Sequence, residues 1–272
     1  WWTVAALLSL LAIGGLYGLR SAGQAAVDAL PPSVDARLGE QAYAQLALQN
    51  QVVEQPELDA ALRGMLERLA PAGGNFSYQV HVFDAATANA FALPGGTLVV
   101  YTGLLRTAQT PEQVAGVLAH EISHVERRHG MRRIAQSLGV VAAFQLMLGD
   151  VSGLAGVAVS VLQQGAINSY SREQEREADL DAAQRMRNAH LDPSALADFL
   201  ALLSREAPSL PGSLSWLGTH PDLAQRIADI RESSARAATS AKPLAIDWAK
   251  LQRELPPLRT PGTPLAATEG AR

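Results

Sequence analysis

The sequence of 272 residues contains no cysteine. That absence excludes disulfide bonds and thiolate metal ligands, so a transition metal in this protein would be held by imidazole and carboxylate groups. Clusters of basic residues are also missing and the formal net charge is only −4, which speaks against a nucleic-acid-binding surface. There is no internal repeat. With 48% hydrophobic residues, a chain of this length predicts one main domain with appended segments.

Charge is missing from the first nineteen residues, WWTVAALLSLLAIGGLYGL, which precede Arg20. This apolar run is long enough to span a bilayer, and the aromatic residues near its two ends suit the headgroup region. We therefore expect residues 1–20 to form an N-terminal transmembrane helix that anchors the protein. A cleaved signal peptide is the main alternative, because the small residues SAGQAA follow. A buried helix of a soluble protein is the third.

The rest of the chain predicts an α+β fold that is mostly helical. A linker over residues 21–33 ends with two consecutive prolines and a serine, and two prolines cannot continue a helix. Two amphipathic helices are expected within residues 34–69, and alternating residues over 76–83 indicate a half-buried strand. Together with the segments 90–93 and 97–101, which flank the turn Pro-Gly-Gly, this strand predicts a small antiparallel sheet.

Two capping patterns predict where the central helices begin. Thr110-Pro-Glu-Gln113 has threonine as N-cap and proline at the first helical position, and the helix should end near Gly130. Ser171-Arg-Glu-Gln174 is a second capping box, which begins a helix that should reach about Ala189.

The apolar segment 138–167 predicts a buried or membrane-skimming helical pair, and a second membrane span is the alternative. Helices that begin at Asp192 and Pro221 complete the main domain, which we place at residues 34–240. Residues 241–272 should hold a C-terminal helix and a proline-rich tail.

The first capped helix carries the stretch VLAHEISHVERRHG, in which His120 and His124 stand four residues apart. Residues at that spacing lie on one face of a helix, so two imidazoles can reach one ion. Glu121 would lie beside them, where it can accept a proton from a water on the metal. The alternative is an ordinary surface helix with solvated histidines. Two histidines do not complete a zinc site, so a third ligand has to come from elsewhere.

Glu175 and Asp179, again four residues apart, are the candidates for that ligand. One carboxylate can bind the ion while the other accepts the ring N–H of a ligating histidine and so fixes its tautomer. The alternative is an acidic, solvated helix face.

Three stretches in this order, AHEISHVERRHG, SREQEREAD and THP, resemble the M48 family of zinc metallopeptidases, which belongs to the gluzincin group. The similarity extends over about residues 38–231. The chain lacks the multiple membrane spans of the family members that process CAAX proteins, and it looks nearer to the single-anchor or soluble members of the bacterial envelope.

The resemblance implies one zinc ion per chain, bound by His120, His124 and Glu175. It also implies that Glu121 is the catalytic base and that Asp179 supports a ligand. The fold implied is a zincin-type metallopeptidase domain whose small sheet packs on the active-site helix. Protein or peptide substrates would pair in extended form with an exposed edge strand, namely Thr97, Leu98, Val99, Val100 and Tyr101.

His220 of the THP stretch precedes a helix, whose positive dipole end discourages protonation of the imidazole. A neutral His220 near zinc could hydrogen-bond the developing oxyanion, or could bind the zinc itself and exclude the water, and a simple helix cap is the third interpretation. Arg226, on the second turn of that helix, could support the site or form a surface ion pair. We assign no metal to His81, to His190, or to His129, which is expected near a helix C-terminus where a cation is favoured.

The function expected on these grounds is that of a zinc-dependent endopeptidase that cuts unfolded or misassembled envelope proteins. It would be held at the bacterial inner membrane by a single span with its catalytic domain in the periplasm, or be soluble in the periplasm after signal cleavage. One alternative is a metal-stabilised chaperone or binding module with a latent zinc site capped by His220. A helical membrane scaffold with a fortuitous motif is the other.

Overall fold

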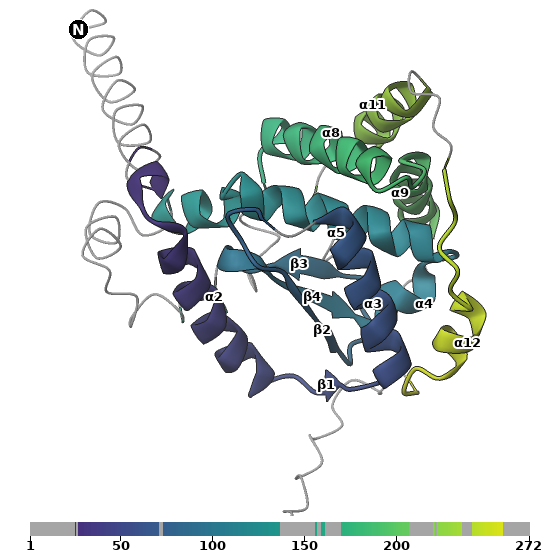
Figure 1. Ribbon diagram of the computed structural model, residues 1–272, viewed down its shortest axis with the longest axis horizontal. Coiled ribbons are helices and arrows are strands. Elements are labelled where there is room, and N and C mark those ends of the chain that lie inside the picture. Colours follow the sequence, from purple (N-terminus) through teal and green to yellow (C-terminus); the bar gives the residue numbers. More distant parts are fainter. Residues whose placement is uncertain are drawn as a thin grey trace, which may run out of the picture.

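The computed structural model describes residues 25, 27–70, 73–136, 156, 159–160, 170–206, 220, 222–235 and 241–257 (Figure 1). The expected anchor at residues 1–20 and nearly all of the apolar segment 138–167 lie outside these residues. Within the described part of the chain, no helix combines the length and the apolar character that a membrane crossing requires. The fold is α+β and mostly helical, as expected.

A four-stranded sheet has the strand order β1-β2-β4-β3. Its strands are β1 (Val52–Val53), β2 (Gln79–Phe83), β3 (Ala90–Ala92) and β4 (Thr97–Tyr101). β2 and β4 run parallel, while β1 pairs with β2 and β3 pairs with β4 in antiparallel fashion. The sheet is therefore mixed, and the expectation of an antiparallel sheet is wrong. The cause is that β4 inserts between the two strands that precede it in the sequence.

β4 is paired along both of its sides, by β2 and by β3, and its three middle residues are buried. A strand in this position has no free edge to offer to a substrate. The expectation that Thr97–Tyr101 is an exposed edge strand is therefore wrong. β3 is instead the last strand of the sheet in the described part of the chain, and Figure 1 shows it next to the long helix α5.

Helices pack against the sheet and against one another. They are α2 (Pro32–Ala47), α3 (Pro56–Leu69), α4 (Thr102–Thr107), α5 (Pro111–Glu126), α8 (Arg172–Asn188), α9 (Ser194–Glu206), α11 (Leu223–Ala235) and α12 (Trp248–Arg253). Figure 1 shows α5 between the sheet on one side and α8, α9 and α11 on the other. Every residue from Gln113 to Val125 is buried, so each polar side chain in that part of α5 needs a partner inside the protein.

α2 rests on the turn that joins β3 to β4, the 3-10 turn η1 (Pro94–Gly96). A Cβ atom at Gly39 would overlap the carbonyl oxygen of Pro94, so only glycine allows this close approach. α2 begins at Pro32, inside the expected linker, because proline is well tolerated at the first helical position. The buried carboxylate of Asp35 accepts a hydrogen bond from Nε of Arg128 at 3.0 Å, which ties α2 to the chain that follows α5.

Residues 241–257, here called the C-terminal strap, include α12 and run past α9 to α4 and α3 (Figure 1). The indole N–H of Trp248 donates to the carbonyl of Ala108 at 2.8 Å. The amide of Gln252 donates to the same carbonyl and to that of Leu105, both at 2.8 Å. The strap thus satisfies carbonyl groups at the end of α4, which have no partner within their own helix.

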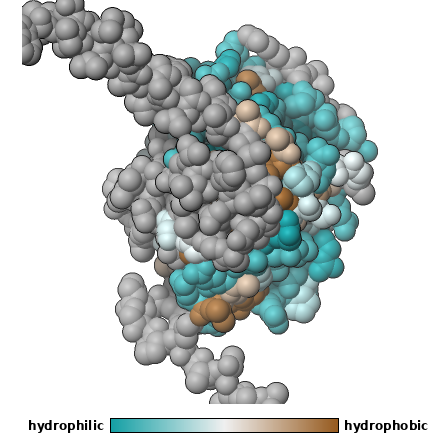
Figure 2. All heavy atoms as spheres, turned by 90° about the vertical axis from the view of Figure 1, so that its left-hand side faces the viewer, coloured by the Kyte–Doolittle hydropathy of each residue, from teal (hydrophilic) through white to brown (hydrophobic). Residues whose placement is uncertain are grey.

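Figure 2 shows the side of the molecule that lies to the left in Figure 1. The coloured surface is mostly hydrophilic, with hydrophobic residues in small areas. Among the described residues, the large hydrophobic side chains that are exposed are those of Leu48 and Leu180. The buried apolar residues instead form two clusters, one around α5 and α9 and one beneath α2.

Candidate metal centre

The local sequence fixes the direction of α5, the helix that presents the two histidines. Thr110 is its N-cap and accepts a hydrogen bond from the backbone N–H of Gln113, and Pro111 takes the first position, as expected. The helix ends at Glu126 rather than near Gly130. It ends early because Arg128 adopts a left-handed backbone conformation with φ of 52°.

α8 crosses α5 and presents acidic side chains to it. The capping box predicted for this helix is confirmed, since Ser171 and Gln174 exchange side-chain to backbone hydrogen bonds. Glu175 stands in the first turn and Asp179 one turn later, and both are buried against α5.

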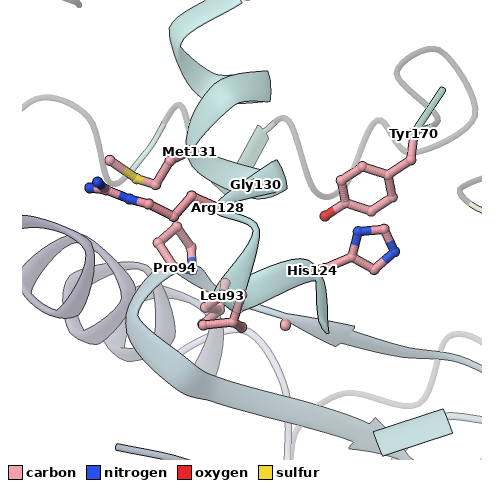
Figure 3. Close-up of a pocket in the computed structure, with 9 residues that line it drawn as sticks. Leu93, Pro94, His124, Arg128, Gly130, Met131 and Tyr170 are labelled. Carbon is pink, nitrogen blue, oxygen red and sulfur yellow. The ribbon is translucent and has the colours of Figure 1, made fainter. Parts of the chain in front are cut away.

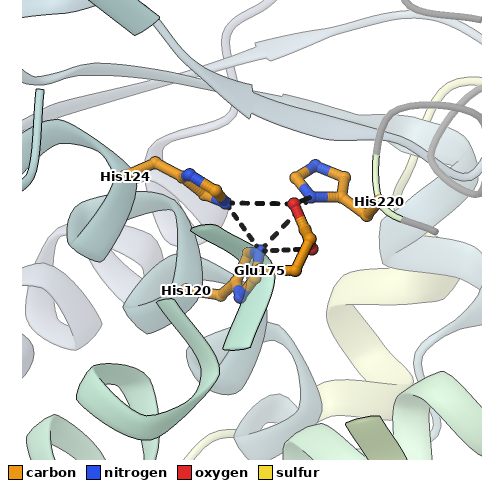
Figure 4. A group of neighbouring side chains, drawn as sticks. All are labelled: His120, His124, Glu175 and His220. Carbon is orange, nitrogen blue, oxygen red and sulfur yellow. Dashed lines mark hydrogen bonds and ion pairs between the residues drawn. The ribbon is translucent and has the colours of Figure 1, made fainter. Parts of the chain in front are cut away.

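Figure 4 shows the group that results, in which His120, His124, Glu175 and His220 point toward one another. One donor atom of each lies within 4.8 Å of the other three. Nε2 of His120 is 3.0 Å from Nε2 of His124 and 3.3 Å from Nδ1 of His220. Carboxylate oxygens of Glu175 lie 3.6 Å from each of the two Nε2 atoms and 2.9 Å from Nδ1 of His220.

These separations can be compared with those required by zinc. Four ligands placed tetrahedrally at ~2.0–2.1 Å from one ion are about 3.3–3.4 Å apart. The distances of 2.9 to 3.6 Å scatter around that value. The donor set of imidazole nitrogen and carboxylate oxygen is also one that zinc accepts. The four side chains therefore fit a zinc ion.

The contact with Asp179 favours one tautomer of His120. Its Nδ1 lies 2.9 Å from Oδ1 of Asp179, and a carboxylate in this position favours the tautomer with the ring proton on Nδ1 and the lone pair of Nε2 toward the donor group. Arg226 donates from Nε and Nη2 to the two oxygens of Asp179, at 2.7 and 2.8 Å. Its Nη1 lies 2.7 Å from Oε2 of Glu175. Arg226 is buried, so its ion pair is an internal one rather than a pair on the surface.

The electrostatics of the group follow mainly from burial. Burial lowers the pKa of His120, against the opposing effect of Asp179, and it lowers the pKa values of His124 and His220 further, so the three rings are neutral. Burial raises the pKa of Glu175 to about 7, although the charge of Arg226 acts in the opposite direction. Burial would also raise the pKa of Asp179, but the hydrogen bonds and charge of Arg226 outweigh it and hold that pKa at about 2.

Glu121 lies beside the donor group and is fixed to the edge of the sheet. Its Oε2 accepts a hydrogen bond from the backbone N–H of Ala92 in β3, at 3.0 Å. Its Oε1 lies 3.6 Å from Nε2 of His220, so this histidine bridges Glu121 and the donor group. α11 begins at Leu223 rather than at Pro221, and His220 precedes this helix, as expected.

Comparison with known proteins identifies the family. Residues 53–234, well over half of the chain, match Peptidase family M48. The chain belongs to this family. The beta-barrel assembly-enhancing protease of Escherichia coli is 30% identical over 222 residues, which make up 77% of this chain and 45% of that protein. The mitochondrial metalloendopeptidase OMA1 of Schizosaccharomyces pombe is 29% identical over 170 residues, or 62% of this chain and 50% of that protein.

A third relative is the metalloprotease YcaL of Escherichia coli, which is 29% identical over 182 residues, or 62% of this chain and 69% of that protein. The chain thus spans about half the length of the first two relatives and a larger share of the third. All three are named as proteases or metalloendopeptidases. The M48 resemblance stated from the sequence is confirmed, and the metallopeptidase class comes with it.

His129 of this M48 domain is a site residue that the sequence reasoning missed. It is fully buried, and its Nδ1 lies 2.8 Å from Nδ1 of His124. Burial, reinforced by the charges of Arg132 and Arg127, lowers its pKa to about 3. The expectation of a cation at a helix end is therefore wrong. The available signal was a third histidine close behind the other two in the sequence.

Tyr170 is the second residue that was missed. Its ring stacks on the imidazole of His124, with the centroids 3.9 Å apart, and the guanidinium of Arg133 lies over the ring at 4.5 Å. Figure 3 shows the two rings facing each other beside a small cavity that Leu93 and Met131 also line. The available signal was an aromatic residue directly before a capping box.

The other two histidines that we left without a metal lie elsewhere. His81 stacks on Tyr43 at the sheet, and His190 follows the end of α8. Neither is a member of the donor group.

Proposed function

We propose that this chain is a zinc-dependent endopeptidase that holds one zinc ion with His120, His124 and Glu175. The observation that carries the proposal is the buried donor group with zinc-like spacing, which lies beside the carboxylate of Glu121. Membership of family M48 and the names of the relatives support it. The substrates would be unfolded or misassembled proteins of the cell envelope, in line with the name of the beta-barrel assembly-enhancing relative.

The chemistry would be divided among few groups. When bound, zinc would supply a Lewis acid for the scissile carbonyl and lower the pKa of the attacking water. Glu121 would accept a proton from that water and pass it to the amine of the leaving group. The hydrogen bond from Ala92 holds its carboxylate in place for both steps. Asp179 would keep His120 in the tautomer that presents its Nε2 lone pair.

The edge strand β3, rather than β4, would receive the substrate. Leu93 N–H donates to the carbonyl of Thr97, so the odd-numbered positions of this segment face β4. The backbone groups of Ala90 and Ala92 therefore face the opposite side, where the N–H of Ala92 meets Glu121. An extended peptide that pairs with this side would lay its main chain beside Glu121. Recognition through main-chain groups suits unfolded substrates of varied sequence.

The central experiment combines metal analysis with a single substitution. Purified protein should contain about one zinc ion per chain. Glu121→Gln should retain zinc and lose cleavage of casein by at least about a hundredfold, because it removes the proton acceptor and not a ligand. Glu126→Gln, an exposed change on the same helix, is the matched control and should cleave normally. Full cleavage by Glu121→Gln would refute the mechanism, and zinc-free protein would refute the metal site.

His220 favours a second candidate, a latent or binding-only state of the same site. Its Nδ1 completes a set of four donor atoms, and a zinc site with four protein ligands has no position for the water. In this state the protein would hold unfolded chains along β3 without cutting them.

Substitution of His220 by alanine separates the two roles of this histidine. Loss of a capping ligand should raise the rate of casein cleavage, whereas loss of an oxyanion donor should lower it about a hundredfold. A binding module would instead cleave nothing as wild type or as His220→Ala, and it would suppress aggregation of an unfolded protein only with zinc present. Cleavage by the wild type would exclude that module.

The proposed location is the periplasmic side of a bacterial inner membrane, with residues 1–20 as a single-span anchor, or the periplasm itself after cleavage of a signal. The apolar composition of residues 1–20 supports it. Fractionation of cells that express the full chain tests it: an anchored protein stays with membranes after a carbonate wash, and a released one appears in the periplasmic extract.

A further inference from the structure

We propose that His129 is a positioning residue of the metal site, which holds His124 with the lone pair of its Nε2 directed at the ion, and that Glu177 fixes His129 in turn. The inference rests on the proposed zinc site, because it concerns how one of the zinc ligands is oriented.

The contact between the two histidines is short and shielded from water. Nδ1 of His124 lies 2.8 Å from Nδ1 of His129, and both side chains are buried. A distance of this size between two ring nitrogens is that of a hydrogen bond, so one proton lies between them. Which ring supplies that proton decides what His124 presents to the donor group, because a neutral imidazole carries one N–H and one lone pair.

The two possible arrangements have different consequences. If His129 supplied the proton, Nε2 of His124 would carry an N–H toward the donor group, and Nε2 of His129 would turn a lone pair toward a carboxylate. If His124 supplies it, its Nε2 lone pair faces the donor group, as zinc requires. Nε2 of His129 then carries an N–H toward Oε2 of Glu177, which lies 3.4 Å away. The negative charge of Glu177 therefore selects the second arrangement.

α8 orients both ligand histidines of α5 through its acidic residues. Asp179 accepts the N–H of His120 directly, at 2.9 Å. Glu177 acts on His124 through His129, and Nη1 of Arg127 lies 3.3 Å from the same oxygen of Glu177. The partners of ligating histidines are usually carboxylates, carbonyls or water. Here an imidazole takes that place.

The backbone explains how His129 reaches His124. In a continuous α-helix, residues five apart point about 140° away from each other around the axis. The helix α5 has ended by this point, and Arg128 has φ of 52°, which breaks the helical path before the next helical turn begins at His129. The guanidinium of Arg128 is bound by Asp35 of α2. α2 thus secures the turn that delivers His129.

Two substitutions at one position test the inference. In His129→Asn the side-chain oxygen can still accept the N–H of His124, and in His129→Phe no acceptor is left. The dissociation constant of zinc, measured by competition with a chelating dye, should rise about 10- to 100-fold in the phenylalanine variant. The asparagine variant should stay near the wild-type value. His81→Phe, a histidine at the sheet away from the donor group, is the matched control.

A spectroscopic readout separates orientation of the ligand from general packing. Cobalt(II) in the zinc site has absorption bands that report ligand geometry. The bands should shift in His129→Phe and be restored in His129→Asn. Equal loss of zinc affinity in the two variants, or a dissociation constant for His129→Phe within about twofold of wild type, would overturn the inference while leaving the peptidase proposal intact. A wild-type protein that binds no zinc would overturn both.

Glu177 offers a test that does not touch the buried core. Its side chain is 37% exposed, so Glu177→Gln should fold as the wild type does. It removes the charge that selects the tautomer, and zinc affinity should fall several-fold. Glu173→Gln, an exposed change on the same helix, should have no effect. Equal affinities of the two variants would count against the role of Glu177.

Discussion

Arg226 donates hydrogen bonds to both carboxylate oxygens of Asp179, at 2.7 and 2.8 Å. Its third nitrogen lies 2.7 Å from Glu175. One buried cation therefore neutralises two buried acids, one from each of two successive turns of α8. Removal of one partner from such a group leaves uncompensated charge in the interior, which costs far more than loss of a surface pair.

Arg226→Met should therefore lower the free energy of unfolding by about 3–5 kcal/mol. Urea denaturation of the metal-free protein measures the change. Arg231→Met is the control, since Arg231 lies on the same helix but its pair with Asp198 is more than half exposed. That variant should lose no more than about 1 kcal/mol. Similar losses of stability in the two variants would contradict the conclusion that Arg226 neutralises the two buried acids.

The pH dependence of zinc binding should follow from Glu175. Its pKa is raised to about 7, and zinc binds only the ionised carboxylate. Below pH 7 a proton competes with zinc, so the dissociation constant should rise about tenfold per pH unit. Above pH 7 the group is already ionised and its contribution is constant. Dye competition between pH 5.5 and 8.5 would show the bend, and a constant affinity down to pH 5.5 would contradict it.

The left-handed conformation of Arg128 predicts an unusual order of stabilities. Both Arg128→Gly and Arg128→Ala lose the bond to Asp35, so both should be less stable than the wild type. Glycine adopts φ of 52° freely, whereas alanine pays about 1–2 kcal/mol for it. The glycine variant should be the more stable of the two by that amount in denaturant unfolding. Equal stability of the two variants would contradict the left-handed backbone conformation at position 128.

Proline at position 90 should probe the edge of β3. The N–H of Ala90 faces away from β4, so Ala90→Pro costs no hydrogen bond within the sheet. It removes one main-chain donor from the proposed substrate edge, so KM for an unfolded substrate should rise about fivefold, which corresponds to about 1 kcal/mol. The N–H of Phe91 faces β4, so Phe91→Pro should destabilise the fold itself. An unchanged KM in a stably folded Ala90→Pro protein would show that the substrate does not bind along this edge of β3.

Local sequence signals located β2, β3 and β4 but not their partners, and they missed the two-residue strand β1 within the region expected to be helical. Alternation and the Pro-Gly-Gly turn placed β4 at Thr97–Tyr101 as observed. The neighbour of a strand depends on contacts between distant segments, and adjacency in the sequence suggested a simple antiparallel order. The consecutive burial of Leu98, Val99 and Val100 is typical of a central strand, and their unbroken apolar run was the signal that argued against an edge.

The candidate site was predictable as far as helix periodicity reaches. The spacing of His120 and His124 and that of Glu175 and Asp179 brought four of the side chains to the correct helix faces, and the structure places them together. His129 was not predictable in this way. Its position depends on the left-handed conformation of Arg128, and arginine is not a residue type from which that conformation is predicted.

The match to family M48 ends at residue 234, yet the fold continues through the C-terminal strap. Trp248, Leu251 and Leu255 belong to the same apolar cluster as the buried residues of α5. Cutting the gene at the end of the recognised region would strip three anchors from that cluster and open the end of α4 to water. The shortest segment that keeps this apolar cluster complete is thus longer than the region that matches the family. A protein expressed for study should therefore extend at least to residue 257.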